Sequence, residues 1–358
     1  MAEYNRHRDD PPLRVLLALT DPWRSDQDVQ IADASGPLSG IDWQAVIRLA
    51  QRHRVLPLVA RRIVELAAIQ KNGEQAGSII PPPLIRAMTA ETQAALLREM
   101  ALLASLREWK SRFDKAGIPL LVLKGLVLSQ RAYGILGQRV NRDIDILIHP
   151  EHLPDVDAMA RNAGYQRVEP AADLDQAGLA QDIIRRKDWV YWHPDSGMIV
   201  EIHHRLFDNV TLCEEGVMER AQTLSLFGQV DVLALALADE IPFLAIHGAL
   251  HAWSRLKWVV DLGNLLRTIP KKERIALISR PANPAARRAL HQGLSLMTEL
   301  YHSNPEITLP MTGARAYLLR KIAANAAIAH GETELEDTRF GTTTKNASHY
   351  FRGSGLQY

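Results

Sequence analysis

Residues Ile118 to Ile148 read IPLLVLKGLVLSQRAYGILGQRVNRDIDILI, and this stretch decides the fold. A short apolar run ends in Lys124-Gly125, a segment of helical character follows, and a second apolar run carries Asp143 and Asp145. Side chains alternate between the two faces of a strand, so the two aspartates project together while the intervening isoleucine packs behind them. Two adjacent carboxylates repel each other unless a cation holds them, and such oxygen pairs suit Mg²⁺. Taken alone, the pair also fits a solvated strand end.

Length and composition narrow the classes of protein. The 358 residues predict two or three lobes, and the 47% of apolar residues can fill their cores. The formal net charge of +1 gives no global attraction to nucleic acid or to an anionic membrane. The single cysteine, Cys213, cannot form an internal disulfide, and the polar first residues contain no signal peptide, which together predict a cytoplasmic protein. The most apolar window, Val232 to Ala252, contains charged residues and predicts a buried helix, not a membrane span.

Helical patterns flank the central stretch on both sides. Asp42 is expected to cap a helix that continues to about Leu66 with a break near Pro57, and the prolines at 81–83 open a long helix through Phe113. Short strands are predicted at 165–168, 189–192 and 198–203, and helices from Val232 onward, the densest at 247–266. The predicted fold is α+β: a helical lobe over residues 1–115, a mixed-sheet core over 116–231, a second helical lobe over 232–330 that closes a cleft, and a flexible tail over 331–358.

A third carboxylate changes the interpretation of the aspartate pair. Glu201 and His203 share one face of the strand predicted at 198–203. Three carboxylates on neighbouring strands are what a two-metal phosphoryl-transfer site requires, and Gly125 lets the backbone approach a phosphate at a helix start. His203 fits a base, a phosphate donor or a structural partner of Glu201.

Several basic residues and histidines are candidates for contacts near this site. Arg139 and Arg142 precede the aspartates and fit either a phosphate clamp or a salt bridge that holds the acidic strand. His247 and His251 lie one turn apart, but Gly248 stands where a zinc-hydrolase helix has its glutamate. We therefore expect the helix to pack over the metal site as a wall of the cleft, with one or more of four polar side chains facing the cleft. These side chains are His247, His251, Arg255 and Lys257.

These residues resemble a known family. Leu123-Lys124-Gly125, the run from Arg142 to Ile148, and Glu201-Ile202-His203 resemble the bacterial uncharacterised nucleotidyltransferase family of the DNA polymerase β-like superfamily. The segments Ile41-Asp42-Trp43, His53-Arg54-Val55 and 247–262 extend the resemblance to roughly residues 40 to 270. Members resemble one another in lying beside genes for surface polysaccharide or modified peptides.

The resemblance implies a function and roles for the site residues. Asp143, Asp145 and Glu201 would be catalytic carboxylates that bind Mg²⁺ or Mn²⁺. The wider superfamily has Gly-Ser or Gly-Gly where this chain has Lys124-Gly125, so Lys124 would supply a point charge to the triphosphate in place of a serine hydroxyl.

The predicted reaction moves a nucleoside monophosphate from an NTP, such as ATP, to an unidentified acceptor and releases pyrophosphate. The acceptor would be a peptide, glycan or small molecule, and not nucleic acid, because the balanced charge predicts no RNA surface. The alternative is a catalytically silent module that binds a nucleotide or a partner protein, a reading that the altered Lys-Gly turn motivates.

Overall fold

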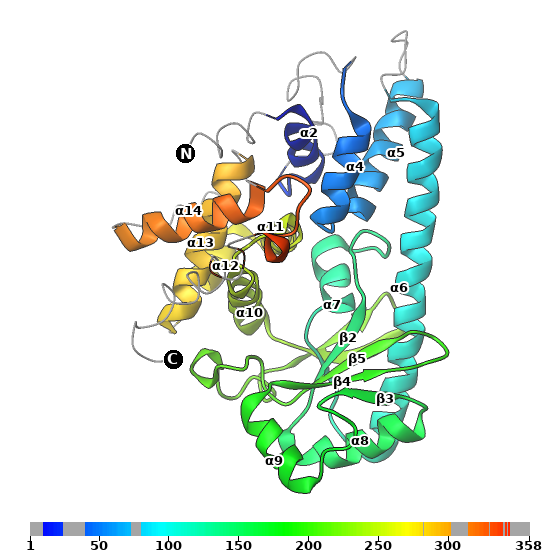
Figure 1. Cartoon of the computed structure of the whole chain (residues 1–358), viewed down its shortest axis with the longest axis vertical. Coiled ribbons are helices and arrows are strands. Elements are labelled where there is room, and N and C mark those ends of the chain that lie inside the picture. The colour runs from blue at the N-terminus through cyan, green and yellow to red at the C-terminus, as the bar shows by residue number, and fades with distance from the viewer. Residues whose placement is uncertain are drawn as a thin grey trace. The chain divides into compact units, whose positions relative to one another are not determined.

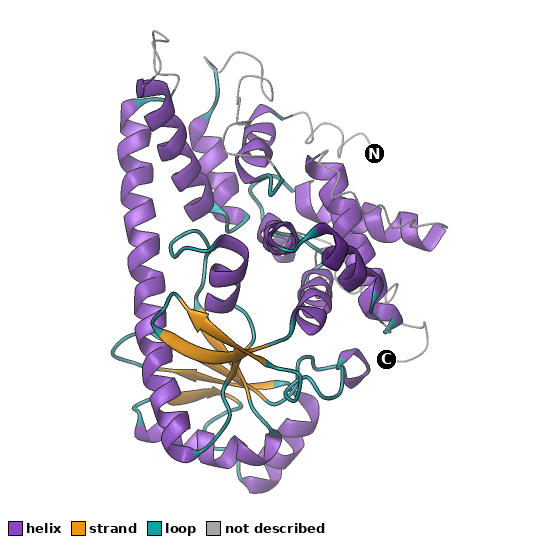
Figure 2. Cartoon of the chain, turned by 180° about the vertical axis from the view of Figure 1, so that it is seen from behind, coloured by secondary structure: helices purple, strands orange, loops and turns teal. Residues whose placement is uncertain are grey.

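The computed structural model describes residues 10–23, 40–72, 80–281, 283–301, 314–328, 330–338, 341 and 343. The chain divides into two compact units (Figure 1). The first unit contains the described parts of residues 1–96, 137–140 and 241–358, and is helical. The second unit contains residues 97–136 and 141–240 and includes the β-sheet (Figure 2). Both helical flanks of the sequence therefore contribute to the first unit.

The helices have the following bounds. They are α2 (Pro11–Thr20), α4 (Trp43–Arg52), α5 (Leu56–Asn72), α6 (Pro82–Ala116), α7 (Leu126–Leu128), α8 (Leu153–Asn162), α9 (Gln176–Arg185), α10 (Leu237–Leu250), α11 (Leu256–Thr268), α12 (Lys271–Ser279), α13 (Pro284–Tyr301) and α14 (Ala314–Ile328), with a π-helical turn at Ser129–Tyr133. Asp42 caps α4, its carboxylate accepting from the Ala45 amide at 2.9 Å, as the sequence predicts. The predicted break before Pro57 is also confirmed, because α5 begins anew at Leu56.

Seven strands form one mixed sheet. They are β1 (Leu121–Val122), β2 (Asp143–Leu147), β3 (Gln166–Glu169), β4 (Asp188–Trp192), β5 (Ile199–His203), β6 (Gln222–Leu226) and β7 (Val230–Ala234), in the order β3-β4-β5-β2-β1-β7-β6. β2 pairs in parallel with β5 and antiparallel with β1. The predicted α+β class with a mixed-sheet core is confirmed.

One face of the sheet packs on a hydrophobic core. Ile144 and Ile146 of β2 join Val200 and Ile202 of β5 in a cluster with the carboxy-terminal half of α6 and with α8. Figure 1 shows the lower half of α6 and α8 beside the sheet. Because side chains alternate along a strand, burial of these residues directs the polar residues of β2 and β5 to the opposite face.

In the first unit, helices from both ends of the chain pack together. The Thr20 hydroxyl of α2 lies 3.3 Å from the hydroxyl of Tyr301 in α13. Arg52 donates from Nη1 to the carbonyl of Ala327, at 2.9 Å. The imidazole of His53 is fully buried, and Nδ1 accepts from the amide of Leu256, the first residue of α11, at 3.2 Å. Burial, aided by Arg52, lowers the pKa of His53 well below its usual value, so the ring stays neutral and can accept this bond.

The prediction of one continuous helix over residues 247–266 is wrong, because α10 ends at Leu250 and α11 begins at Leu256. Ala252 and Trp253 both have positive φ, at 52° and 54°, which ends α10. Trp253 is fully buried, and its ring occupies space left by the missing side chains of Gly248 and Gly293. Its indole Nε1 donates to Gln292 Oε1 at 3.2 Å, so the tryptophan is held on several sides. Burial of this large side chain offsets the cost of its left-handed backbone.

Strand β7 differs from the prediction. The sequence predicts helices from Val232 onward, but residues 230–234 form β7, which pairs in parallel with β1. A run of alternating apolar residues this short does not distinguish a strand from a buried helix.

The predicted flexible tail begins with residues that are packed in the first unit. Leu335 is fully buried and Glu334 pairs with Arg255 at 3.0 Å, whereas most of residues 339–358 lie outside the described part of the chain. No helix among the described residues is both long and apolar enough to cross a membrane.

Gly293→Ala is expected to destabilise the protein. Its Cβ would lie 2.6 Å from the buried ring of Trp253, which has no room to move, so overpacking should lower the free energy of unfolding by about 1–3 kcal/mol. Gly178→Ala in α9 is the matched control, since its Cβ would meet a leucine methyl at 3.0 Å that can rotate away. Urea denaturation measures both, and equal effects of the two substitutions would contradict the assigned packing of Trp253.

Candidate metal centre and phosphate turn

The candidate site lies on the polar face of the sheet. In the parallel pairing of β2 with β5, Asp145 is opposite Glu201, and Leu147 is opposite His203. β4 pairs with β5 on the other side and places Asp188 opposite His203. Alternation therefore brings the three side chains of Asp145, Glu201 and His203 to one face, as the sequence predicts, with Asp188 beside them.

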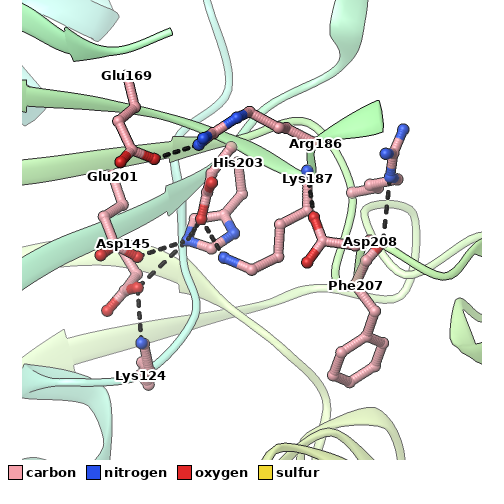
Figure 3. A network of polar contacts seen from close by, with 11 residues as sticks. Lys124, Asp145, Glu169, Arg186, Lys187, Glu201, His203, Phe207 and Asp208 are labelled. Carbon is pink, nitrogen blue, oxygen red and sulfur yellow. Dashed lines mark hydrogen bonds and ion pairs between the residues drawn. The ribbon is translucent and has the colours of Figure 1, made fainter. Parts of the chain in front are cut away.

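His203 is the centre of this cluster. Its Nε2 lies 3.2 Å from Asp145 Oδ1, 3.4 Å from Glu201 Oε2 and 3.8 Å from Asp188 Oδ2. Figure 3 shows the imidazole beside the carboxylates of Asp145 and Glu201. Because His203 is only 3% exposed, these contacts take place away from bulk water, where charges interact strongly.

Lys124 approaches the same cluster from the end of β1. Its Nζ lies 2.9 Å from Asp145 Oδ1, and the Asp145 side chain is completely buried. Burial by itself lowers the pKa of Lys124, but the carboxylates of Asp145, Asp143 and Glu201 outweigh burial and raise it. Lys124 is therefore a fixed positive charge in this site.

The two facing carboxyl groups have opposite pKa shifts. Burial alone would raise the pKa of Asp145, but Lys124 and His203 together hold it well below its usual range. Burial raises the pKa of Glu201, and the negative charge of Asp145 raises it further. The hydrogen bond from His203 lowers this pKa, but by less than the other effects raise it. Burial lowers the pKa of His203 less than its bonds to the two carboxylates raise it. Asp145 is thus the member of the pair that ionises more readily.

These residues fit a divalent cation. One donor atom each from Asp145, Glu201 and His203 lies within 4.8 Å of the others. Asp145 Oδ2 is buried and receives no hydrogen bond from any described residue. Carboxylate oxygens suit Mg²⁺ and Mn²⁺, and the imidazole would join them as a ligand once its Nε2 has lost its proton. Asp143 lies outside this group, two residues earlier on the same face of β2 and partly exposed, so its predicted role as a metal ligand stays a prediction.

Gly125 forms the turn between β1 and α7. Its φ of +64° is a conformation that glycine adopts without strain. A Cβ at this position would lie 3.7 Å from the Asp143 carbonyl and 3.9 Å from Asn141 Oδ1, so the turn runs directly beside the strand that carries the aspartates.

A buried network holds this turn. Ser129 Oγ, one helical turn after Gly125, donates to the carboxylate of Glu99 in α6 at 2.5 Å. Asn141 Nδ2 donates to the same carboxylate oxygen and to Ser129 Oγ. Since Glu99 is 1% exposed, it fixes the helix after Gly125 to the segment that leads into Asp143. Sequence analysis missed this glutamate, because a single acidic residue in a long helix looks like an exposed one.

The two arginines before the aspartates differ. Arg139 Nε donates to Asp261 Oδ2 of α11 at 3.0 Å, and both side chains are buried, so this salt bridge joins Arg139 to α11 and not to the acidic strand β2. Arg142 is exposed and forms no ion pair with a described residue, so it remains a candidate for phosphate contact.

The predicted cleft-wall residues lie in the first unit. His247, His251 and Trp258 form a ring cluster in which His251 stacks on Trp258 at 4.8 Å, with 9° between the planes. Arg255 lies over the same tryptophan at 5.7 Å. Lys257 Nζ donates to the Val140 carbonyl at 3.4 Å. Their role in a cleft remains a prediction.

Two further residues of the cluster were missed in the sequence. Lys187 and Asp188 form an ion pair at the start of β4, and Asp208 accepts from the Lys187 amide at 2.9 Å (Figure 3). The strand predicted at 189–192 begins one residue after Asp188, which is the first residue of β4. Extending its alternation back from Val190 would have placed Asp188 on the face of Glu201.

The fold and the site together define an α+β protein with a buried Asp/Glu/His group that could hold a metal ion. Residues 39–302 match the family described as uncharacterised nucleotidyltransferase, which is more than half of the chain. The chain therefore belongs to this family, and the resemblance predicted from roughly residues 40 to 270 is confirmed. A comparison with curated proteins finds no match.

Gly125→Ala is expected to strain the turn. An alanine at φ +64° and ψ −116° costs about 1–3 kcal/mol, although its Cβ has room, so both stability and NTP binding should weaken. Gly134→Ala is the control, because Gly134 also has a positive φ, with φ +75° and ψ −7°, and open space around the Cβ, but lies at the other end of the helix. Calorimetric titration with NTP and Mg²⁺ compares them. Equal loss of NTP affinity in both variants would show that Gly125 has no particular role in phosphate binding.

Asp261→Asn is expected to leave the Arg139 guanidinium buried without its carboxylate. Because both side chains are less than a tenth exposed, the free energy of unfolding should fall by about 3–5 kcal/mol. Asp114→Asn removes the partner of Lys110 on the exposed face of α6 and should cost less than about 1 kcal/mol. Urea denaturation of both variants checks this, and similar small losses would contradict a structural role for the Arg139 pair.

Proposed function

We propose that the protein is a metal-dependent nucleotidyltransferase that transfers a nucleoside monophosphate from an NTP to an acceptor and releases pyrophosphate. The observation that carries this proposal is the buried group of Asp145, Glu201 and His203 next to the turn at Lys124-Gly125. Family membership supports the reaction class.

The carboxylates would hold the metal. Asp145 and Glu201 face each other across β2 and β5, and Asp143 lies on the same face nearer the phosphate turn. His203 keeps Asp145 and Glu201 together through its Nε2. A bound Mg²⁺ or Mn²⁺ would neutralise phosphate charge and lower the pKa of the attacking group.

The turn at Gly125 would receive the triphosphate. A helix start presents unpaired N–H groups to an anion, and a glycine lets the phosphate approach the backbone. Lys124 precedes this turn and Arg142 is exposed next to Asp143, so both can add positive charge there. The Glu99 network would keep the turn at a constant distance from the aspartates.

The acceptor would attack the α-phosphorus in line with the leaving group. Its new P–O bond forms as the bond to the bridging oxygen of pyrophosphate breaks, and its proton leaves to solvent. Since Lys124-Gly125 lies at the β1 side of the carboxylates, the in-line geometry places the acceptor toward β5 and β4, near Glu201 and Asp188. We propose a peptide, glycan or small molecule as the acceptor.

A silent binding module is the second candidate. The observation in its favour is that Lys124 already forms an ion pair with Asp145. In such a module, this ion pair would only stabilise the folded protein. A module of this kind would bind a nucleotide or a partner protein and turn nothing over. Metal-dependent turnover of any NTP would reject it.

Asp145→Asn should abolish transfer. It keeps the shape but removes the charge, so we expect at least about a 100-fold loss of NTP turnover and weaker Mn²⁺ binding. Label transfer from α-labelled NTPs to pooled acceptors and Mn²⁺ titration by electron paramagnetic resonance measure the two effects. Asp155→Asn, an exposed change in the first turn of α8, is the control. If the wild type binds no NTP with Mg²⁺ and Asp145→Asn behaves identically, the proposed function fails.

A further inference from the structure

The ammonium of Lys124 lies at the carboxylate that is the candidate ligand of a metal ion. Its ammonium contacts Asp145 Oδ1 at 2.9 Å, and this oxygen is also 3.2 Å from His203 Nε2. A divalent ion bound to the same oxygen would meet the positive charge of Lys124 at close range. The two cations therefore compete for Asp145.

Asp145 cannot remain buried and charged without a partner. Its side chain is completely buried, and an isolated carboxylate in that position costs several kcal/mol. Lys124 and His203 satisfy one oxygen, whereas Oδ2 receives no hydrogen bond from the described residues. The carboxylate is thus stabilised by the lysine but has one oxygen ready for another cation.

Lys124 is also placed to reach a phosphate. It immediately precedes Gly125, whose positive φ starts the turn into α7, and the Lys124 side chain is 18% exposed. A lysine side chain has a flexible four-carbon stem, so the ammonium can move without a change in the backbone. The three carboxylates that act on it, of Asp145, Asp143 and Glu201, outnumber its single charge. They would still attract a metal ion after the lysine has left.

We propose that Lys124 exchanges partners during substrate binding: it pairs with Asp145 in the nucleotide-free protein and with a phosphate of the NTP when the metal–nucleotide complex binds. This inference rests on the proposed function of the site. The exchange makes binding of free metal unfavourable and binding of the metal–NTP complex favourable. Metal and nucleotide then bind cooperatively, and the coupling is reciprocal.

The test is Lys124→Met, which keeps most of the stem and removes the charge. Without nucleotide, this variant should bind Mn²⁺ about tenfold more tightly than the wild type, because the competing ammonium is gone. With non-hydrolysable analogues of the four NTPs, Mn²⁺–nucleotide binding should weaken by about tenfold, because the phosphate loses its partner. Electron paramagnetic resonance follows Mn²⁺, and calorimetry follows the nucleotide.

Two controls separate this effect from a general one. Lys110→Met removes a lysine that pairs with Asp114 at 2.6 Å on exposed α6, and should change neither affinity. Lys124→Arg keeps the charge and should keep weak binding of free Mn²⁺. Thermal unfolding gives a second readout: Mn²⁺ alone should raise the melting temperature of Lys124→Met more than that of the wild type, because it replaces the lost partner of Asp145.

The outcomes distinguish this inference from the proposed function. Unchanged or weaker binding of free Mn²⁺ by folded Lys124→Met, with no larger thermal shift, overturns the exchange even if the enzyme turns over NTP. Tighter Mn²⁺ binding with unaltered nucleotide binding also overturns it, since the lysine then has no second partner. If the wild type binds Mn²⁺ but no NTP, the proposed function fails instead.

Discussion

The site depends on how the charge of one buried carboxylate is balanced. Asp145 has no access to water, so its charge requires Lys124 and His203, and their contacts determine where both side chains lie. His203 also contacts Glu201, which brings the second carboxylate against the first despite their repulsion. The positions of the turn after β1 and of strand β5 are therefore both set by the same interaction. Exchange of one cation for another at Asp145 would alter this balance without changing the fold.

The two faces of the sheet explain how such a cluster can exist in a stable protein. The isoleucines and valine between the polar residues of β2 and β5 are packed with α6 and α8, and their burial stabilises the strands. The polar residues need not contribute to stability, and mutual repulsion on their face is tolerated. The register of the pairing between β2 and β5 therefore determines whether the site forms, since a shift by one residue would turn Asp145 and Glu201 to opposite faces.

Sequence reasoning predicts what depends on local periodicity. The alternation around Asp143 and Asp145 and around Glu201 and His203 was sufficient for the two strands and for their shared face, whereas the family was predicted from the resemblance of the motifs. It failed where tertiary contacts decide. The break at Ala252 and Trp253 depends on two glycines that leave room for an indole ring, and one of them, Gly293 in α13, lies far outside the run from 247 to 266. The Glu99 network and the strand β7 likewise depend on residues distant in the sequence.

The same charge balance explains the lysine before Gly125, where the resemblance leads one to expect a Gly-Ser turn. A Gly-Ser pair in place of Lys124-Gly125 could bind phosphate through the serine hydroxyl but could not neutralise a buried aspartate. Lysine can do both, although not at once, because a single ammonium on a flexible stem contacts either carboxylate or phosphate. Ser129 is not available as a substitute, since its hydroxyl is committed to Glu99. In the proposed exchange, Lys124 would therefore link the charge of the metal site to the phosphates of the substrate, which a serine turn would not do.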